Sequence, residues 1–425
     1  MTTWVPDVSP ESPFSLANIP FGIITTEHDS TRRAAVAIGS YVVDLKALSQ
    51  SKSLIEGKDE VFSQPTLNAF AALGRPVHRE VRELLRDILS SGTTHPEAFK
   101  DNEELRTKAL IPQSKVRLHL PMAIRDYTDF YVGYNHAYNV GVLFRGPANA
   151  LQPNYTHLPV GYHGRASSIV VSGTPIRRPW GQILLDPTAE PKQPTTAPSR
   201  RLDIELELGC FVCKSNDLGE PVKVEDAENH IFGYVLLNDW SARDIQAWEY
   251  VPLGPFNGKN FGSTISPWVV LADALEPFRT KGLEHKAQPV QDYLKESKEE
   301  TAFDIKLEID LITPEGDTTT IGVTNSNQLM WSFPQMIAHH TLGGCNLNTG
   351  DLLGSGTISG KEPSERGSLL EMSEGGKRDI MIKGMDVRKF LKDGDTVTLR
   401  GTCGRQGEYV GFGECTGTIY SAIQR

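Results

Sequence analysis

Residues 202–208 read Leu-Asp-Ile-Glu-Leu-Glu-Leu, and this alternation of aliphatic and acidic side chains decides the fold class. Successive side chains of a β-strand point to opposite faces, so the pattern predicts a strand with Asp203, Glu205 and Glu207 on one face. The carboxylates of Glu205 and Glu207 would lie roughly 6–7 Å apart and repel each other. Two interpretations are open: an exposed edge strand with a hydrated acidic face, or a cation held between the carboxylates.

The composition is that of an ordinary globular protein. The chain has 425 residues, of which 39% are hydrophobic and 23% charged, enough for two or three domains. The formal charge of -10 argues against nucleic acid as a partner. No uncharged apolar run reaches about 18 residues, so we expect a cytoplasmic protein that does not associate with membranes. The five cysteines do not suggest a disulfide framework.

The N-terminal part, residues 1–118, combines strand and helix patterns. Apolar runs at 21–24 and 34–43 predict short strands, and apolar residues at helical spacing within 77–89 predict an amphipathic helix. It contains no catalytic constellation. We therefore expect this part to pack, to support a dimer or to shield a site.

From residue 119 onward, short apolar runs alternate with Gly and Pro. The runs at 167–173, 233–237 and 303–311 predict strands of a largely antiparallel architecture. The polar and charged segment 278–301 predicts a surface insertion. The whole chain is thus expected to be mostly β with some α.

Phosphate-binding loops and serine hydrolase motifs are excluded by their spacing. The Gly-rich run 254–260 is one residue too short for a Walker loop, and 354–360 is one residue too long for a dinucleotide fingerprint. There is no G-x-S-x-G motif either.

Acidic residues elsewhere in the chain favour the cation. Asp239 follows an apolar strand, where an Asp commonly caps the next turn, and Asp129 lies in another acidic motif. Together with Glu205 and Glu207 they would supply four hard oxygen donors, as Mg²⁺ or Ca²⁺ requires. Zinc is disfavoured because no His or Cys cluster has ligand spacing.

Several long motifs closely resemble the fumarylacetoacetase (fumarylacetoacetate hydrolase) family and follow one another in the family's order. They are residues 12–22, 126–131, 136, 139–146, 158–168, 202–208, 238–262, 354–360 and 368–371. The resemblance covers nearly the whole chain. It implies a small N-terminal SH3-like β-barrel domain over residues 1–118, a larger C-terminal catalytic β-roll domain over residues 119–425, and a homodimer.

The resemblance also implies an activity and its cofactor. The activity is hydrolysis of a carbon–carbon bond in 4-fumarylacetoacetate to give fumarate and acetoacetate, which ends tyrosine and phenylalanine catabolism. Ca²⁺ or Mg²⁺, or both, would serve as cofactor. Because water attacks a ketone and the leaving group is a carbanion, such a site needs a base, an oxyanion hole and an electron sink.

The family's functional positions carry over to named residues here. The implied metal-binding positions are Asp129, Glu205, Glu207, Asp239, Lys259 and Ser263. The implied catalytic residues are His136 as general base, Glu371 as its orienting carboxylate, and Arg243, Gln246 and Lys259 around the oxyanion. The implied substrate-binding residues are Tyr131, Arg145, Tyr162, Arg243, Gln246, Tyr250 and Thr357, with Arg145 suited to pair with a terminal carboxylate.

Two of these positions need comment. A charged Lys259 could ligate a metal only through its backbone carbonyl, and Ser263 stands where we expect Thr, with the hydroxyl kept. Arg243 and Gln246 are three residues apart and would share a face of a helix.

Two alternatives belong to other functional classes. Isomerases, decarboxylases and acylpyruvate hydrolases of the wider superfamily share the acidic site, but they would often lack the long N-terminal domain and the motif around His136. A non-catalytic metal-binding or interaction protein would lack the base, the ligands or the oxyanion groups. All of these features are present here.

Overall fold

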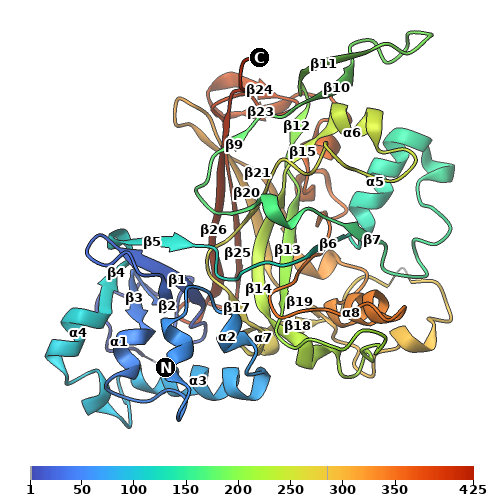
Figure 1. Ribbon diagram of the computed structural model, residues 1–425. Coiled ribbons are helices and arrows are strands. Elements are labelled where there is room, and N and C mark those ends of the chain that lie inside the picture. Colours follow the sequence, from blue (N-terminus) through green and yellow to red (C-terminus); the bar gives the residue numbers. More distant parts are fainter. Residues whose placement is uncertain (1, 285) are drawn as a thin grey trace.

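The computed structural model describes residues 2–284 and 286–425 and shows a sheet-rich fold of mixed strands and helices. The N-terminal part, in blue in Figure 1, gathers on one side of the molecule, and the two larger sheets fill the rest. Within the described residues, no helix combines the length and the apolar character needed to cross a bilayer.

The N-terminal part is built on a five-stranded antiparallel sheet in the order β4-β3-β2-β1-β5. Its strands are β1 (Phe21–Thr26), β2 (Arg33–Ile38), β3 (Tyr41–Asp44), β4 (Leu110–Pro112) and β5 (Val116–His119), and its helices are α1 (Leu45–Ser49), α2 (Asn68–Ala71), α3 (Arg75–Ile88) and α4 (Glu103–Ala109). The helix expected within 77–89 is α3. The run 34–43 forms the β2–β3 hairpin, which turns at Gly39 with a φ of 56°.

A larger mixed sheet carries the acidic residues. Its path is β7 (Gly161–His163), β6 (Tyr127–Phe130), β22 (Leu352–Gly354), β13 (Leu206–Val212), β14 (Ile231–Asp239), β16 (Ser263–Ile265) and β8 (Ile169–Val171), and β17 (Val270–Leu271) also pairs with β14. The strands expected at 167–173 and 233–237 are β8 and β14. This sheet therefore joins segments that are distant in sequence.

A five-stranded sheet packs against β14. Its order is β21 (Thr318–Asn325), β20 (Lys306–Ile312), β25 (Thr396–Cys403), β26 (Val410–Tyr420) and β9 (Ile176–Arg177). The strand expected at 303–311 corresponds mainly to β20. Trp240 packs so closely on Gly417 that a Cβ there would lie 2.5 Å from its ring. In Figure 1, β13 and β14 run beside β25 and β26.

The 202–208 stretch enters the centre of the larger sheet only from Leu206 onward, and its first residues belong to a separate pair of strands. β12 (Leu202–Asp203) pairs with β15 (Ser241–Ala242), and β13 begins only at Leu206. Between them, the Glu205 N–H donates to the side-chain oxygen of Asn238 at 3.2 Å instead of to a backbone carbonyl. The expected uninterrupted strand is therefore wrong at residues 204 and 205.

The expected shared face of the two glutamates is confirmed, because Glu205 and Glu207 line one cavity. The exposed-edge interpretation is wrong. β13 lies between β22 and β14, and Glu205 and Glu207 are only 5% and 0% exposed.

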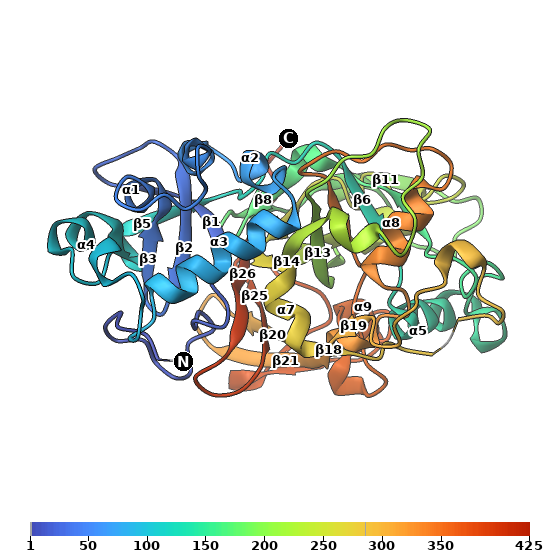
Figure 2. The same cartoon turned by 90° about the horizontal axis from the view of Figure 1, so that it is seen from below.

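Helices and short strand pairs complete the fold. The helices are α5 (Tyr134–Arg145), α6 (Arg243–Glu249), α7 (Ala272–Leu275), α8 (Phe333–Thr341) and α9 (Leu369–Met372), and the remaining pairs are β10 (Trp180–Leu184) with β11 (Pro194–Pro198), β18 (Arg279–Thr280) with β19 (Ala302–Phe303), and β23 (Ile380–Ile382) with β24 (Asp386–Arg388). Helix α9 contacts α5, and both lie at the same end of the molecule in Figure 2.

The segment 278–301, expected as a surface insertion, is anchored to the fold. Leu294 is fully buried, and its carbonyl accepts a hydrogen bond from Gln335 of α8 at 2.7 Å.

Candidate active site

A cavity of about 450 Å³ gathers most of the residues that the motifs singled out. The predicted residues that line it are Asp129, Tyr131, His136, Arg145, Tyr162, Glu205, Glu207, Arg243, Gln246, Tyr250, Lys259 and Thr357. Asp239 and Ser263 line an adjoining cavity of about 520 Å³, which shares Tyr162 and Lys259 with the first. Glu371 lies behind His136 and contacts it directly.

Three buried carboxylates, each from a different strand, converge where these two cavities adjoin. Asp129 of β6, Glu207 of β13 and Asp239 of β14 each offer an oxygen, and these oxygens lie within 4.8 Å of one another. Strand β22 separates β6 from β13, and its Gly354 leaves room for the cluster. A Cβ at that position would lie 3.0 Å from an oxygen of Glu207. The absence of a side chain at residue 354 thus lets the carboxylates converge across the sheet.

Two of the three carboxylates keep an oxygen that the described residues leave without a partner. Oδ1 of Asp129 and Oε1 of Glu207 are buried and have no hydrogen-bond partner among the described residues. Burial raises the pKa of both carboxyls well above the usual value, and the neighbouring Asp239 raises them further. A divalent cation would supply the missing partner, and an all-oxygen donor set fits Ca²⁺ or Mg²⁺.

Glu205 has a different environment from the other three carboxylates. Its side chain forms ion pairs with Lys259 and, at 2.8 Å, with Arg243, and it lies 3.6 Å from Nε2 of His136. Burial alone would raise its pKa, but Lys259 and Arg243 outweigh burial and lower it. Its negative charge is therefore already compensated by the protein.

Lys259 and Ser263 both contact Asp239. The ammonium of Lys259 bridges Glu205 and Asp239, and these two carboxylates raise its pKa although burial opposes the charge. The Ser263 hydroxyl donates to Oδ1 of Asp239 at 2.9 Å. Both residues thus lie next to the cluster and hold one of its members.

His136 and Glu371 form a buried pair between α5 and α9. The distance from Nδ1 of His136 to Oε2 of Glu371 is 2.6 Å, so a neutral imidazole that donates from Nδ1 leaves Nε2 free to accept a proton. Glu371 also accepts hydrogen bonds from Asn139, Ser359 and Ser368 at 2.8–2.9 Å. Burial opposes its charge, yet His136, Asn139 and Ser359 lower its pKa to about 2.

Helix α6 supplies Arg243 and Gln246 to the same cavity. Nη1 of Arg243 donates to Oε1 of Gln246 at 3.2 Å, which confirms that these residues share a helical face. Nε of Arg243 donates to Asp203 at 2.8 Å. Asp203 and Gln246 thus fix the orientation of the guanidinium.

The predicted substrate-binding residues surround the rest of the cavity. Tyr250 is 42% exposed and lies at its rim, whereas the Thr357 hydroxyl is buried without a partner among the described residues. Arg145 donates from Nε and Nη2 to the carbonyls of residues 149 and 150, at 3.0 and 2.6 Å. The edge of the guanidinium formed by Nε and Nη2 is therefore occupied, and a carboxylate would have to approach the end formed by the two Nη atoms.

Sequence reasoning missed the residues that hold this machinery in place. Asp203 was expected to face the same way as the glutamates of the cluster, but it binds Arg243 and the start of α9. Ser368 stands three residues before Glu371, a spacing typical of a helix N-cap that could have been noticed. Asn139 and Ser359 gave no comparable signal.

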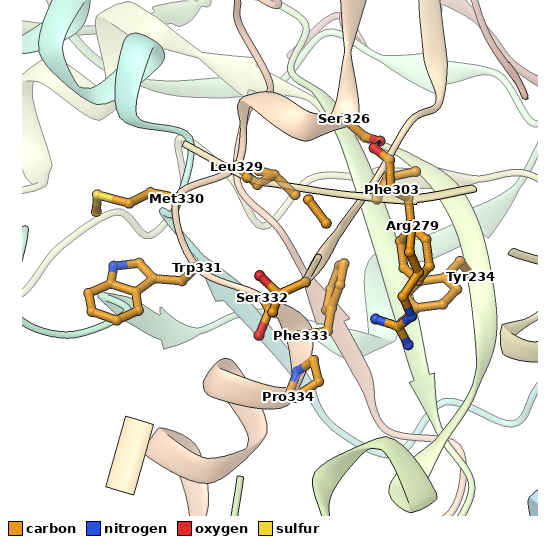
Figure 3. Close-up of a pocket in the computed structure, with 14 residues that line it drawn as sticks. Tyr234, Arg279, Phe303, Ser326, Leu329, Met330, Trp331, Ser332, Phe333 and Pro334 are labelled. Carbon is orange, nitrogen blue, oxygen red and sulfur yellow. Dashed lines mark hydrogen bonds between the residues drawn. The ribbon is translucent and has the colours of Figure 1, made fainter. Parts of the chain in front are cut away.

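Another cavity, of about 20 Å³, lies apart from these residues (Figure 3). Aromatic side chains such as Tyr234, Phe303 and Phe333 line it, and the Ser326 hydroxyl donates to the Phe303 carbonyl at 2.6 Å. It holds about one water molecule and offers no room for a substrate.

Two protein-family models match the chain. The fumarylacetoacetase N-terminal model matches residues 17–121, and the fumarylacetoacetate (FAA) hydrolase C-terminal model matches residues 128–420.

Curated relatives match over nearly the full length. The chain is 59% identical to a fumarylacetoacetase of Emericella nidulans, covering 100% of this chain and 99% of the relative. It is 47% identical to the fumarylacetoacetase of Homo sapiens, covering 98% of each.

A solved structure has the same fold at low sequence identity. The fumarylacetoacetate hydrolase from psychrophilic Exiguobacterium antarcticum aligns with a TM-score of 0.52 at 17% identity, over 95% of this chain and 99% of that one.

Proposed function

Since the chain belongs to the fumarylacetoacetase family, we propose that its cavity hydrolyses fumarylacetoacetate to fumarate and acetoacetate, a step of tyrosine catabolism. The observation that carries this proposal is the His136–Glu371 pair, which faces a buried carboxylate cluster across one cavity. A base beside a cation site is what the attack of water on a diketone needs.

The proton transfers centre on His136. Its Nε2 removes a proton from water as the water oxygen bonds to the ketone carbon, and Glu371 stabilises the imidazolium that forms. The carbon–carbon bond then breaks, and its electron pair leaves as the enolate of acetoacetate. The imidazolium returns its proton to the leaving carbon, which restores the neutral base.

Charge on oxygen is stabilised from two sides. Arg243, Gln246 and Lys259 are proposed to donate to the oxyanion of the attacked ketone. A divalent cation held by the carboxylate cluster would supply Lewis-acid stabilisation of the negative charge that develops on oxygen.

The cation is proposed to lie at Asp129, Glu205, Glu207 and Asp239, with Lys259 and Ser263 in its surroundings. The unpartnered oxygens of Asp129 and Glu207 support these two residues as ligands most directly. Glu205, which is compensated by Lys259 and Arg243, would share its charge between these residues and the cation.

Substrate recognition is assigned to the residues that line the remaining cavity wall. These are Tyr131, Arg145, Tyr162, Tyr250 and Thr357, besides Arg243 and Gln246. The buried Thr357 hydroxyl offers a free donor, and the end of the Arg145 guanidinium offers a cation for a terminal carboxylate.

The remaining proposals concern architecture. Residues 1–118 would form an SH3-like barrel, residues 119–425 a catalytic β-roll, and the protein would be a cytoplasmic homodimer. The small five-stranded antiparallel sheet of the N-terminal part supports the first description, and the two packed sheets support the second.

The test is an absorbance assay of diketone loss after exhaustive chelation and after addition of Ca²⁺ or Mg²⁺. We expect turnover of fumarylacetoacetate that depends on the cation and slower turnover of a simple acylpyruvate. Faster cleavage of the acylpyruvate would assign the chain to another activity of the superfamily. Full activity after metal removal would contradict the cation site.

A further inference from the structure

We propose that Asp203 is a positioning residue that fixes Arg243 and α9, the helix that bears Glu371, relative to each other. This inference rests on the proposed function, which gives Arg243 and Glu371 their roles. Asp203 itself is fully buried and does not line the catalytic cavity.

The carboxylate of Asp203 contacts both parts of the machinery at once. Oδ2 accepts from Nε of Arg243 at 2.8 Å and from the Leu370 N–H at 2.9 Å, and Oδ1 accepts from the Leu369 N–H at 2.7 Å. The N–H of Ile204 donates to the same Oδ1 at 2.7 Å. One rigid planar group therefore spans α6 and α9.

The contacts at α9 fix the backbone that carries Glu371. The first N–H groups of a helix have no partner within the helix, and in α9 these belong to Leu369 and Leu370. Asp203 accepts from both, and the Ser368 hydroxyl accepts from the N–H of Glu371 at 3.3 Å. A displaced Asp203 would move Glu371 and, through it, the imidazole of His136.

The contact at α6 fixes the orientation of Arg243. Its Nε is held by Asp203, so that Nη1 reaches Gln246 and Nη2 lies 2.8 Å from Glu205. A ligand role for Asp203 is disfavoured because both of its oxygens are already used, unlike those of Asp129 and Glu207.

The experiment compares Asp203→Asn with Asp203→Glu. The amide has one acceptor oxygen for four donors, whereas Glu keeps the charge and the ion pair but displaces the carboxylate by one methylene. A positioning role predicts that both variants lower kcat, on the order of 10²-fold for a displacement near 1 Å, while KM changes little. A role limited to charge compensation predicts wild-type kcat in Asp203→Glu.

Asp44→Asn is the matched control. Asp44 is also buried, pairs with the Nε of Arg33 and accepts from a helix N-terminal N–H, that of Ala47, but it lies in the N-terminal sheet. We expect it to lower thermal stability and to leave kcat per folded molecule unchanged. Folded fractions come from circular dichroism, and binding of Ca²⁺ alone is measured by calorimetry.

The outcomes separate the two proposals. An inactive wild type with bound Ca²⁺ would overturn the proposed function. An active wild type with unchanged kcat in Asp203→Glu, or with an equal loss in Asp44→Asn, would overturn the positioning role. Loss of kcat in both Asp203 variants with retained Ca²⁺ binding is the expected result, and Asp203→Glu alone decides the question if Asp203→Asn does not fold.

Discussion

The carboxylates of the site fall into two groups that differ in what compensates their charge. Asp203, Glu205 and Glu371 are surrounded by guanidinium, ammonium, hydroxyl and backbone donors. Asp129 and Glu207 each keep a buried oxygen without a partner in the described part of the chain. The first group maintains geometry, and the second is where a cation would gain most of its binding free energy.

We expect Glu371→Gln to lower kcat by about 10²–10⁴-fold. The amide removes the charge that stabilises the His136 imidazolium and disturbs the donors around it. Steady-state kinetics with fumarylacetoacetate measure the effect. Glu414→Gln, a side chain 63% exposed on β26, is the control and should retain wild-type kcat. Near-normal turnover in Glu371→Gln would exclude the proposed base.

Glu207→Gln should raise the thermal stability of the chelated protein and reduce the stabilisation that Ca²⁺ provides. Burial and the like charges of Asp129 and Asp239 raise the pKa of Glu207, so a neutral amide removes a repulsion that the carboxylate can relieve only by binding a proton or a cation. Thermal unfolding with chelator and with Ca²⁺ measures both effects. The exposed Glu225→Gln serves as control. A wild-type response to Ca²⁺ in Glu207→Gln would count against the site.

At the residue scale, motifs predicted which side chains line the cavity and that Glu371 contacts His136, but not the other groups that hold these side chains. Glu205 was found from the strand alternation, whereas His136 and Arg243 came from the resemblance to the family. The contact between Asp203 and Leu369 spans 166 positions, and no local pattern encodes it. Backbone donors in particular carry no sequence signal.

At the scale of elements, helix α5 owes its position to the absence of a side chain at Gly141. A Cβ there would overlap the backbone carbonyl of Ala150. We expect Gly141→Ala to lower the free energy of unfolding by about 1–3 kcal/mol despite its better helix propensity, and to lower kcat because α5 carries His136. Thermal unfolding and kinetics measure the two effects.

The control for this variant is Gly92→Ala. Gly92 lies in a loop without a positive φ, and a methyl group added there would meet no atom of the described residues within 4 Å. Its substitution should change the free energy of unfolding by no more than a few tenths of a kcal/mol and should leave kcat unchanged. Equal losses of stability in the two variants would show that the close approach at Gly141 does not contribute to the free energy of unfolding.

His78 of α3 should make stability depend on pH. It is buried between Phe70 and Phe232, and burial lowers its pKa to about 4. Between about pH 6.5 and 4 the unfolded chain binds a proton that the folded chain does not, so stability falls as pH falls, on the order of 3 kcal/mol in all. His78→Gln should flatten this part of the profile, as urea unfolding at several pH values would reveal.

The exposed His28→Gln is the control for the pH profile and should follow the wild type. An unchanged slope in His78→Gln would mean that other groups cause the acid sensitivity.

Element types were predictable from the sequence where periodicity is strong. The alternation at 202–208 and the helical spacing at 77–89 gave a strand and a helix in the right places. The break at residue 205 was not predictable, because it depends on a hydrogen bond from Glu205 to Asn238 on a neighbouring strand. Side chains that substitute for backbone acceptors leave the hydrophobic pattern unchanged.

At the scale of the whole molecule, α3 of the N-terminal part is joined to α7 by ion pairs. The Arg75 guanidinium is 9% exposed and lies 3.0 Å from Asp273, and the 61% exposed Arg79 lies 2.7 Å from the same carboxylate. We expect Arg75→Gln to cost about 3–5 kcal/mol in free energy of unfolding, because it leaves the buried Asp273 carboxylate with less compensation. Arg79→Gln should cost about 0–1 kcal/mol, because solvent already screens it.

Urea unfolding followed by circular dichroism measures both substitutions. Similar small losses in the two variants would show that the contact between the N-terminal part and α7 does not depend on the buried ion pair.

The separation of His136 and Glu371 by 235 positions has a consequence for synthesis on the ribosome. When residues up to about 340 have emerged, the chain already contains His136 and the three acidic residues of the cluster, but neither α9 nor the strands β25 and β26 exist. Strand β22, which lies between β6 and β13, is also missing at that length, so neither the carboxylate cluster nor the oriented base can form before the C-terminal part has been made. We expect catalytic competence to arise only after residue 371 has been made, so a premature stop codon before this residue should leave a protein without turnover.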